Sequence, residues 1–423
     1  MLQITSLRND TENIINALAI KNFDAAPIVA QILTLDDERR STQKKMDDLL
    51  AETNKLAKET GELFKNGKQQ EANLLKDKSL EIKKNAKDLE ENLKVIEEKL
   101  TGLLLQLPNT PHHSIKPGKT ADDNEIVMTK GDIPVLSEEA LPHWDLAIKY
   151  KLIDFELGNK ITGAGFPVYT GKGARVQRAL IQFFLDSAVN AGYTEIQPPL
   201  MVNEASAFGT GQLPDKDGQM YYAAVDNLYL IPTAEVPVTN LYRDMILKET
   251  DLPVKNAAYS ACFRREAGSY GKDVRGLNRL HQFDKVEIVQ IQHPDKSYDT
   301  LKEMCDYVAG LLTQLELPFR ILKLCGGDIS FTSAMTYDFE VFSAAQKRWL
   351  EVSSVSNFES FQANRMKLRF KNKDGKINFA HTLNGSALAL PRIVAALLEN
   401  NQTPEGIKMP TVLRKYTGFE LIN

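Results

Sequence analysis

Two strand-like segments carry the densest set of reactive side chains in the sequence. They are ACFRRE, which ends at Glu266, and LHQFDKVEIV, which begins at Leu280. In an antiparallel strand–loop–strand unit, the period of two would place Arg264 and Glu266 on one face. The same period would place Phe283 and Glu287 together on one face. A face with two ionisable groups, an aromatic ring and a further acid is unusual for a sheet to bury, which favours a functional site; a salt-bridged sheet surface is the alternative interpretation.

The connection between these two segments is rich in glycine and in basic side chains. Its members are Gly268, Gly271, Lys272, Arg275, Gly276 and Arg279.

Two further segments contain charged groups in otherwise apolar surroundings. Small residues lead from Leu383 into an apolar helix, predicted to reach Glu399, in which Arg392 is the lone charge. A lone buried charge needs a partner, although Arg392 on an exposed helix side is equally possible. Glu351 and Ser354 lie three residues apart and could hold magnesium, but a hydrogen bond at a strand end is the commoner explanation.

Cysteine and histidine patterns exclude several other chemistries. The three cysteines have no CxxC spacing, so we expect neither a disulfide framework nor a structural zinc site. The six histidines form no HExxH pattern, and His112 and His113 are interpreted as a loop pair.

The N-terminal region has a different texture from the rest of the chain. Apolar residues recur at 3–4 spacing, which predicts two helices of an antiparallel coiled-coil hairpin within residues 28–104, with breaks at Gly61 and at Asn66-Gly67. The first seam comprises Ile32, Leu35, Arg39, Thr42, Met46, Leu49, Thr53 and Leu56. The second seam comprises Leu75, Ser79, Ile82, Ala86, Leu89, Leu93, Ile96, Leu100 and Leu103. Each predicted arm of about 30 residues would reach about 45 Å.

The predicted hairpin has a basic end. Nine lysines and five acidic residues lie between Lys55 and Lys87, a local net charge of +4. A solvated helix surface is one interpretation, and a surface that follows a phosphate backbone is the other; charge alone does not decide between them.

Composition limits the remaining possibilities. The chain has 423 residues, 43% of them hydrophobic, which is enough for a large core and excludes disorder as the main state. A net charge of −4 gives no global basic field, so any nucleic acid would need a local patch. The N-terminus has no signal-peptide pattern, and the longest apolar run, residues 387–398, is interrupted by Pro391 and Arg392. A soluble cytoplasmic protein is expected, in which residues 121–134 link the hairpin to a mixed α and β body.

Taken together, the segments resemble the signature motifs of class II aminoacyl-tRNA synthetases. Residues 191–199 (AGYTEIQPP) resemble motif 1, which forms a dimer interface in that class, and residues 263–266 (FRRE) resemble motif 2. Residues 385–392 resemble motif 3, in which Pro391 is compatible with the first turn of a helix. The hairpin, the Thr233-Ala234-Glu235 triplet and the Asn384-Gly385-Ser386 run narrow the resemblance to the bacterial-type seryl-tRNA synthetase family, over essentially the whole chain.

This resemblance implies a fold and a domain organisation. It implies an α+β protein with an N-terminal coiled-coil arm and a class II catalytic domain, which is built on an antiparallel sheet flanked by helices. Residues 1–108 would form the tRNA-binding arm and residues 109–423 the catalytic domain. The expected reaction is ATP-dependent activation of L-serine to seryl-adenylate, followed by transfer to the 3′-terminal adenosine of tRNA(Ser), with tRNA(Sec) as a further possible substrate.

The resemblance also implies a serine site. Arg264 would bridge the serine carboxylate and the α-phosphate of ATP, and Glu235 would balance the serine ammonium. Glu287 and Ser386 would recognise the hydroxyl, which would exclude alanine without an editing domain. The complete expected set is Thr233, Ala234, Glu235, Arg264, Glu287, Asn384 and Ser386.

The implied ATP site surrounds the adenine ring and the phosphates. Phe283 and Arg392 would sandwich adenine, Glu266 would accept its amino group, and Arg279 would pair with the γ-phosphate. Glu351 and Ser354 would be ligands of Mg²⁺. The complete expected set is Arg264, Arg265, Glu266, Arg279, Leu280, Phe283, Glu351, Val352, Ser353, Ser354 and Arg392.

The implied partners are tRNA and a second copy of the chain. In the family, the arm of one subunit reaches across a homodimer to the tRNA that is bound at the other subunit. The basic end of the hairpin suits that contact, and its expected tRNA-binding residues are Lys78, Lys83, Lys84 and Lys87.

Three alternatives remain beside this reading. A ligase that loads a carrier protein would share the catalytic motifs but typically lacks the long arm. A non-enzymatic RNA-binding protein with a decayed body would have lost its costly charged residues, yet Arg264, Glu287 and Glu351 are present. A zinc-dependent form of the enzyme would need a clear Cys/His cluster.

Overall fold

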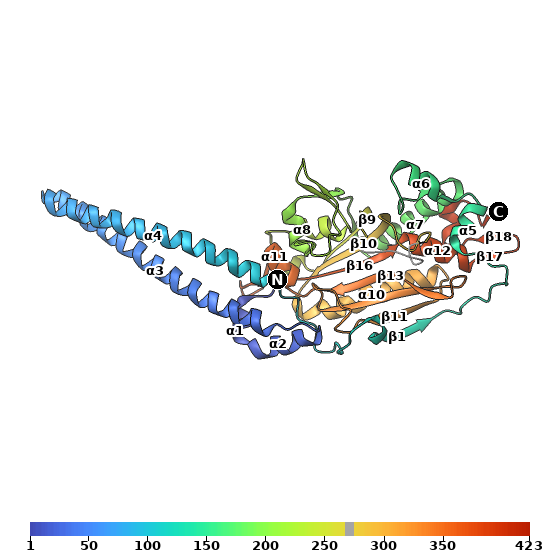
Figure 1. The fold of residues 1–423 in the computed structure, drawn as a ribbon, viewed down its shortest axis with the longest axis horizontal. Helices are drawn as coiled ribbons and strands as arrows, with labels where there is room; N and C mark the ends of the chain where they lie inside the picture. The colour runs from blue at the N-terminus through green and yellow to red at the C-terminus, as the bar shows by residue number, and fades with distance from the viewer. Residues whose placement is uncertain (267–274) are drawn as a thin grey trace. The chain divides into compact units, whose positions relative to one another are not determined.

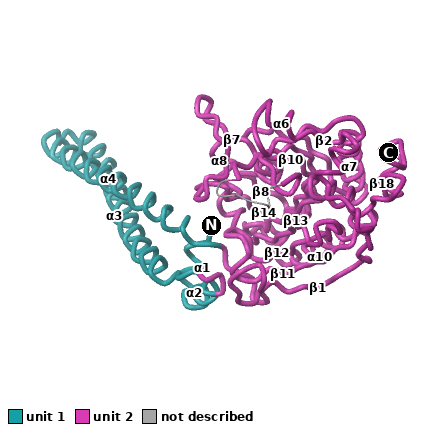
Figure 2. Tube along the Cα trace, turned by 45° about the vertical axis from the view of Figure 1, so that its right-hand side comes forward, with its two compact units in different colours: residues 1–19, 23–108 teal, residues 20–22, 109–423 magenta. Residues whose placement is uncertain are grey.

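The structure is a computed structural model that describes residues 1–266 and 275–423 of the chain. It divides into two compact units, which Figure 2 colours separately. Unit 1 comprises residues 1–19 and 23–108, and unit 2 comprises residues 20–22 and 109–423. None of the described helices is long and apolar enough to cross a membrane.

Unit 1 is built around a helical hairpin (Figure 1). The short helices α1 (Ile4–Asn9) and α2 (Thr11–Ile20) precede α3 (Ala26–Lys65) and α4 (Gln69–Leu104), which pack against each other. Their 40 and 36 residues correspond to about 60 and 54 Å of helix, longer than the sequence predicts. The predicted break at Gly61 is wrong, because one glycine costs only about 1 kcal/mol in a helix that a partner supports.

The predicted seams of the hairpin lie at the contact between α3 and α4. Every predicted seam residue is buried or half-buried, and the helices turn at Asn66 and Gly67 as expected. Asp36 is a buried charge outside the predicted seams: it is 2% exposed and pairs with Arg8 at 2.6 Å and with Arg39 at 2.8 Å. Burial alone would raise the pKa of Asp36, but these two guanidinium groups hold that pKa below its ordinary value.

Unit 2 is organised by one large sheet. Within the described residues it has eight strands in the order β1-β11-β12-β13-β16-β10-β9-β4, and every pairing except β4 with β9 is antiparallel. The strands are β1 (Glu125–Lys130), β4 (Thr194–Glu195), β9 (Val254–Phe263), β10 (Gln282–Gln292), β11 (Phe319–Lys323), β12 (Met335–Ser343), β13 (Arg348–Asn357) and β16 (His381–Ala389). The expected antiparallel-rich α+β architecture is confirmed.

The two faces of this sheet differ in chemistry. On one face Val286, Ile288, Phe339 and Val355 belong to a large apolar core. The helices that fill this core are α7 (Gly171–Asn190), α10 (Ser297–Gln314) and α12 (Leu390–Asn400). The alternating residues point to the opposite face and are mostly polar, because side chains alternate along a strand.

The remaining elements of unit 2 surround the sheet. The further helices are α5 (His143–Lys149), α6 (Phe155–Ile161), α8 (Glu204–Thr210), α9 (Glu235–Asn240), α11 (Phe361–Met366) and α13 (Thr411–Thr417). The short strands are β2 (Ile153–Asp154), β3 (Val168–Tyr169), β5 (Met201–Val202), β6 (Tyr222–Ala223), β7 (Leu228–Leu230), β8 (Ile246–Lys248), β14 (Arg369–Lys371), β15 (Ile377–Phe379), β17 (Gln402–Thr403), β18 (Gly406–Lys408) and β19 (Leu421–Ile422).

Two local predictions differ from the structure. The expected linker over residues 121–134 contains strand β1, which pairs with β11 at the sheet edge although all six of its residues are exposed. An edge strand without a buried face leaves no apolar alternation to detect. The apolar run at residues 193–201 predicts a strand, but it forms only the short strand β4 and the start of β5, because Pro198 and Pro199 remove two ladder donors.

Candidate active site

A row of polar residues crosses the sheet on the face opposite the core. Asp338 of β12 pairs in register with Ser354 of β13, and Glu287 of β10 pairs with Ser386 of β16. Residues directly opposite in an antiparallel pair share a face. Gly385 of β16 pairs with Val355 of β13, so Ser354 and Ser386 are neighbours across the remaining strand pair.

A bulge in β13 brings the two expected metal ligands together. In a regular strand, residues three positions apart point to opposite faces, so Glu351 and Ser354 would be separated. The register slips by one residue here, because Phe339 pairs with Ser353 whereas Glu340 pairs with Glu351. The inserted residue is Val352, and it returns Glu351 to the face of Ser354.

Asp338 is a third oxygen donor at this place, and it was not anticipated from the sequence. It accepts a hydrogen bond from Ser354 and interacts electrostatically with Glu351. Burial, and then the charge of Glu351, raises the pKa of Asp338 well above its ordinary value. Within the described residues, its Oδ1 atom is buried and has no hydrogen-bond partner.

These donors fit a divalent cation of the hard type. Two carboxylates and a hydroxyl supply oxygen ligands, and a cation would satisfy the unpaired Asp338 Oδ1 atom. Among the described residues, no group of three or more His, Cys, Asp or Glu side chains is arranged to hold a metal ion. Two carboxylates and one hydroxyl leave further positions around such a cation for water or for ligand oxygens.

The expected serine residues converge between β10, β16 and α9. Glu287 Oε2 accepts a hydrogen bond of 3.2 Å from the Thr233 hydroxyl, and Ser386 lies opposite Glu287. Asn384, two residues from Ser386 on the same face of β16, hydrogen-bonds Glu235. Ala234 is fully buried at the N-cap of α9 and belongs to a small apolar cluster with Ala258 and Val289 of the sheet.

Glu235 has an unusual electrostatic environment. Burial and the nearby charge of Glu287 raise the pKa of Glu235 to about 7. The Gln362 side chain opposes this shift, because its Nε2 atom donates to Glu235 Oε1 at 2.7 Å. Gln362 is itself fixed, since its Oε1 atom accepts from the Thr382 hydroxyl at 2.7 Å. The sequence contains no pattern that marks Gln362 as a member of the site.

Lys285 is a further site residue that sequence reasoning missed. It lies between Phe283 and Glu287 on the same face of β10, and its Nζ atom is 2.5 Å from Glu287 Oε2. Both side chains are buried, so the pair is taken out of water. The period of two that grouped Phe283 with Glu287 also includes Lys285, and this signal could have found it.

The arginine and aromatic residues lie at the β9 end of the row. The Arg264 guanidinium is 5.1 Å from the centroid of the Phe283 ring, and Arg264 Nε donates to the Pro232 carbonyl at 3.4 Å. Strand β9 ends at Phe263, so the prediction that a strand places Arg264 and Glu266 on one face is wrong. Glu266 instead has φ of 50°, in the left-handed region, and its carboxylate pairs with Arg279.

The two other arginines are held by groups of the same site. Arg279 Nε donates to Glu266 Oε2 in a short ion pair. Arg392, near the start of α12, donates to the Glu351 carbonyl at 2.7 Å and to the Asn278 carbonyl at 3.2 Å. The charge that interrupts this apolar run therefore has the partners that its position requires, and Pro391 lies in the first turn of α12 as expected.

Some expected residues do not present their side chains to the row. Val352 packs in the apolar core, and Leu280 is 5% exposed and belongs to the same core. The Ser353 hydroxyl donates to the Ser386 carbonyl at 2.5 Å, so it links β13 to β16. Arg265 is exposed. Gly268, Gly271 and Lys272 of the basic connection lie outside the described residues.

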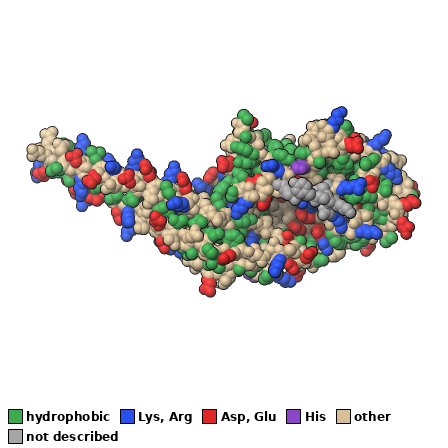
Figure 3. Space-filling view, in the orientation of Figure 1, with side chains coloured by type: hydrophobic (Ala, Val, Ile, Leu, Met, Phe, Trp, Pro, Cys, Tyr) green, Lys and Arg blue, Asp and Glu red, His purple; other side chains and the backbone are tan. Residues whose placement is uncertain are grey.

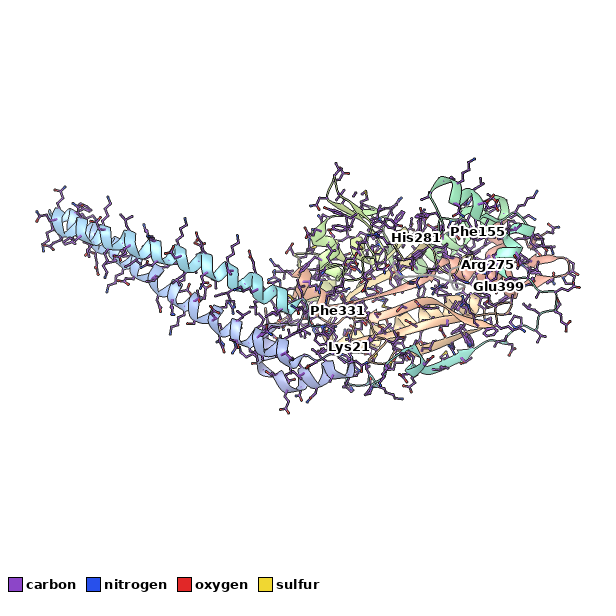
Figure 4. All side chains as sticks on the ribbon, in the orientation of Figure 1. Lys21, Phe155, Arg275, His281, Phe331 and Glu399 are labelled. Atoms are coloured by element: carbon purple, nitrogen blue, oxygen red, sulfur yellow. The ribbon has the colours of Figure 1, made fainter. Side chains whose placement is uncertain are left out.

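A cavity lies beside the returning part of this connection. Its volume is about 270 Å³, and Leu280, Arg275, Phe166 and Phe155 line it. Figure 4 labels Phe155, Arg275 and His281 around this end of unit 2. His281 stacks on Phe166 with ring centroids 5.4 Å apart.

The four expected tRNA-binding lysines lie on α4 of unit 1. All four are exposed, and Lys78 pairs with Glu52 of α3 at 3.0 Å. Figure 3 shows that charged side chains of both signs are interspersed along this hairpin.

Comparisons with known proteins agree with this geometry. Residues 222–401 match the tRNA synthetase class II core domain (G, H, P, S and T), and residues 1–111 match the seryl-tRNA synthetase N-terminal domain. The chain is 51% identical over 424 residues to the serine–tRNA ligase of Salinibacter ruber, with 100% of the chain and 99% of the relative covered. It is 47% identical to the serine–tRNA ligase of Chlorobaculum parvum, with both proteins fully covered.

A solved structure shows the same fold. Seryl-tRNA synthetase from Pyrococcus horikoshii, crystallised with ATP, superimposes with a TM-score of 0.92 at 34% identity and covers 100% of this chain and 99% of its own. The fold and the site thus define a class II aminoacyl-tRNA synthetase. Within that class, the chain belongs to the seryl-tRNA synthetase family. The family, the fold class and the ligase class predicted from the sequence are confirmed.

Proposed function

We propose that this chain is an ATP-dependent ligase that joins L-serine to tRNA(Ser) in two steps. The serine carboxylate attacks the α-phosphate of ATP, which forms seryl-adenylate and releases pyrophosphate. The 3′-terminal adenosine of the tRNA then takes the seryl group, and AMP leaves. The observation that carries this proposal is the polar row, in which a cluster of two carboxylates and a hydroxyl lies on the same sheet as an aromatic ring with an arginine over it.

In this proposal the serine pocket reads each polar group of the amino acid. Ionised Glu235 pairs with the ammonium beside Thr233 and Ala234, while Asn384 and Gln362 hold the carboxylate of Glu235 in place. Glu287 and Ser386 bind the hydroxyl. Because one oxygen of Glu287 already accepts from Thr233 and Lys285, the other is left to accept from serine. Alanine would leave these buried groups unpaired and is rejected.

We infer that ATP binding exchanges internal pairs of the site for contacts with the nucleotide. Adenine takes the face of Phe283 that the Arg264 guanidinium covers, and Arg392 lies over its other side. Arg264 turns to bridge the serine carboxylate and the α-phosphate, where its planar fork suits two anions. Arg279 leaves Glu266 for the γ-phosphate, and Glu266 then accepts from the adenine amino group. Arg265 and the backbone of Leu280, Val352 and Ser353 line the same site.

The reaction uses ATP with a divalent metal ion, and we propose that this ion is Mg²⁺. Glu351 and Ser354 would hold it, with Asp338 as the third oxygen donor. The ion would supply charge neutralisation at the phosphates. The residues of the chain contribute mainly by positioning the two substrates and by stabilising charge, since this displacement at phosphorus needs little covalent help.

We further propose a division of labour along the chain. Residues 1–108 form the tRNA-binding arm, whose Lys78, Lys83, Lys84 and Lys87 contact the phosphate backbone, and residues 109–423 form the catalytic domain. The enzyme acts in the cytoplasm as a homodimer in which each arm serves the tRNA on the other subunit. tRNA(Sec) is a second acceptor where the cell contains it.

Acylation of bulk tRNA with labelled serine, ATP and Mg²⁺ tests this function. Label retained on tRNA supports it, because neither a carrier-loading ligase nor a decayed enzyme produces that result. If tRNA stays unlabelled while serine-dependent pyrophosphate exchange persists, the chain is a carrier ligase. If both activities are absent, the catalytic proposal is wrong.

A further inference from the structure

A buried hydrogen-bond network ties the returning part of the basic connection to the core of unit 2. Residues 276–280 precede β10 and end in Arg279 and Leu280, which the proposed function assigns to ATP. Neither residue lies in a helix or strand, so their placement depends on how the backbone before them is held. His143 of α5 holds that backbone through a hydrogen bond, and Glu399 of α12 hydrogen-bonds His143 in turn.

His143 is the direct contact. Its side chain is fully buried, and its Nε2 atom accepts the Leu277 backbone N–H at 2.8 Å. Because Nε2 accepts, the ring proton must be on Nδ1, which lies 2.7 Å from Glu399 Oε1. Glu399 therefore fixes the tautomer that makes the contact with Leu277 possible.

Glu399 is well satisfied although it is completely buried. Its oxygens also accept the His143 backbone N–H at 2.9 Å, the Gln346 amide at 2.9 Å and the Ser343 hydroxyl. Burial alone would raise the pKa of Glu399, but hydrogen bonds from the His143 ring, the Ser343 hydroxyl and the His143 backbone hold that pKa below its ordinary value. An ionised carboxylate at this place gives the network one fixed charge around which the donors are oriented.

A second route connects the same network to Arg392. The Gln346 side chain accepts from the Asn278 amide at 3.0 Å, and the Asn278 carbonyl accepts from Arg392 Nε at 3.2 Å. Glu399 and Arg392 lie at opposite ends of α12. The network thus spans the helix and reaches both the residue that would cover adenine and the backbone beside Arg279.

The fit at the His143 ring is close. Gly276 has φ of 68°, and a Cβ atom there would collide with His143 Nε2 and press on Trp144. The backbone at residues 276 and 277 therefore lies directly on the imidazole, with no space for a side chain between them. Figure 4 shows Glu399 and Arg275 at the same end of unit 2.

We propose that His143 is a positioning residue for ATP, which acts by holding the Leu277 backbone so that Arg279 and Leu280 meet the nucleotide. The proposal rests on the proposed function, because it takes Arg279 and Leu280 as ATP contacts. His143 touches neither substrate. Its removal should therefore weaken ATP binding without changing the serine pocket, which other strands build.

The test compares two replacements of His143 with a matched core variant. His143→Phe keeps an aromatic ring but removes the acceptor, whereas His143→Gln retains an oxygen or nitrogen at about the reach of Nε2. Leu146→Ala, one turn along α5 and 2% exposed, creates a cavity in the same core and serves as the control for a purely structural effect. Each variant is measured for its melting temperature, its KM values for ATP and serine in pyrophosphate exchange, and the backbone hydrogen exchange of residues 275–282.

His143→Phe should raise the KM for ATP by about tenfold, as expected for the loss of one buried acceptor, and change the KM for serine by less than about twofold. It should also accelerate hydrogen exchange at Leu277, and His143→Gln should restore part of both properties. If Leu146→Ala gives the same shift in KM for ATP at equal loss of stability, or if Leu277 keeps its protection in His143→Phe, the inference is wrong. Absence of exchange activity in the unmodified enzyme would contradict the proposed function instead, whereas hydrogen exchange at Leu277 would still test the contact.

Discussion

The hairpin of unit 1 and the large sheet of unit 2 use opposite ways of placing side chains. In α3 and α4 each contact repeats after three or four residues, so one local rule generates the whole seam. In the sheet, the polar row takes its members from β10, β12, β13 and β16 together with α9, and the pair of Gln362 with Glu235 spans 127 positions. A periodic structure tolerates many single changes, whereas a convergent one concentrates its function in a few side chains.

The largest effect that would test this contrast is expected at Arg264. Arg264→Ala should lower serine-dependent pyrophosphate exchange by about 10³-fold, comparable to the loss of a key charge-stabilising donor in other active sites. Arg264→Lys keeps the charge but not the planar fork, so it should recover only part of the activity. Arg40→Ala, an exposed arginine of α3, serves as the control and should leave exchange unchanged. Full exchange activity in Arg264→Ala would contradict the proposed role of Arg264.

A smaller and more selective effect is expected at the basic part of α4. Exchanging Lys78, Lys83, Lys84 and Lys87 for glutamate should lower tRNA acylation by about 10- to 100-fold at moderate salt, because phosphate contacts carry the binding. Pyrophosphate exchange, which needs no tRNA, should stay within about twofold of the unmodified enzyme. The control is the same charge reversal, lysine to glutamate, at Lys371, Lys373 and Lys376, which are exposed on unit 2. Equal loss of acylation and exchange would show that the arm is not a separate tRNA-binding element.

Glu235 gives the serine site a pH dependence. Its pKa is raised to about 7 by burial and by Glu287, and only the ionised form pairs with the serine ammonium. The KM for serine should therefore rise as pH falls below 7, by about tenfold per pH unit, and should be flat above about pH 8. The KM for ATP measured in parallel should lack this step.

The same group has a defined effect on stability. Because the folded state binds this proton more tightly than an unfolded glutamate, with an ordinary pKa of 4.5, its contribution to the free energy of unfolding is fully present below that value and is lost as pH rises through about 7. Gln362→Leu removes a donor that stabilises the ionised form, so it should move the serine profile to higher pH. A serine profile that is flat between pH 6 and 8 would exclude Glu235 as the ammonium partner.

The smallest effects are expected when one glycine from each region is replaced by alanine and the free energy of unfolding is measured. Gly67, in the turn of the hairpin, has φ of 75° and no atom within 4 Å of an added Cβ, so Gly67→Ala should cost about 1 kcal/mol through backbone strain. Gly385 of β16 lies against Val355, and an added Cβ would be 2.9 Å from Val355 Cγ2, so Gly385→Ala should cost about 1–3 kcal/mol. Chemical denaturation measures both values. In addition, Gly385→Ala should raise the KM for serine through Ser386, whereas Gly67→Ala should leave both KM values unchanged.

The contrast also explains what could be predicted from the sequence. The hairpin seams follow directly from spacing, and the one clear error, the break at Gly61, arose because a partner helix supports a local weakness. The expected serine residues were grouped through the family resemblance, and Lys285 was available from strand alternation. Asp338 and Gln362 could not be found in this way, because they join the site through strand pairing and helix docking between distant parts of the chain.

Backbone position has a similar limit. The alternation that pairs Phe283 with Glu287 is correct because β10 is regular, but the same rule failed for Glu266 beyond the end of β9. For Glu351 and Ser354, the simple period would have separated the two residues, and only the irregular register of β13 unites them. Periodicity therefore predicts side-chain faces within regular strands. It fails at strand ends and bulges, where Glu266 and Glu351 of the candidate site lie.

The bulge at Val352 determines which face of the sheet each preceding side chain of β13 occupies. If Val352 instead joined the ladder with β12 as a regular residue, the strand would stay intact, yet every side chain before it would change faces. Glu351 would then point into the apolar core, and Leu350 would point out toward the nucleotide side. Evolution can lengthen the hairpin of unit 1 in whole heptads without such a change of face, whereas β13 keeps Glu351 beside Ser354 only while Val352 stays outside the ladder.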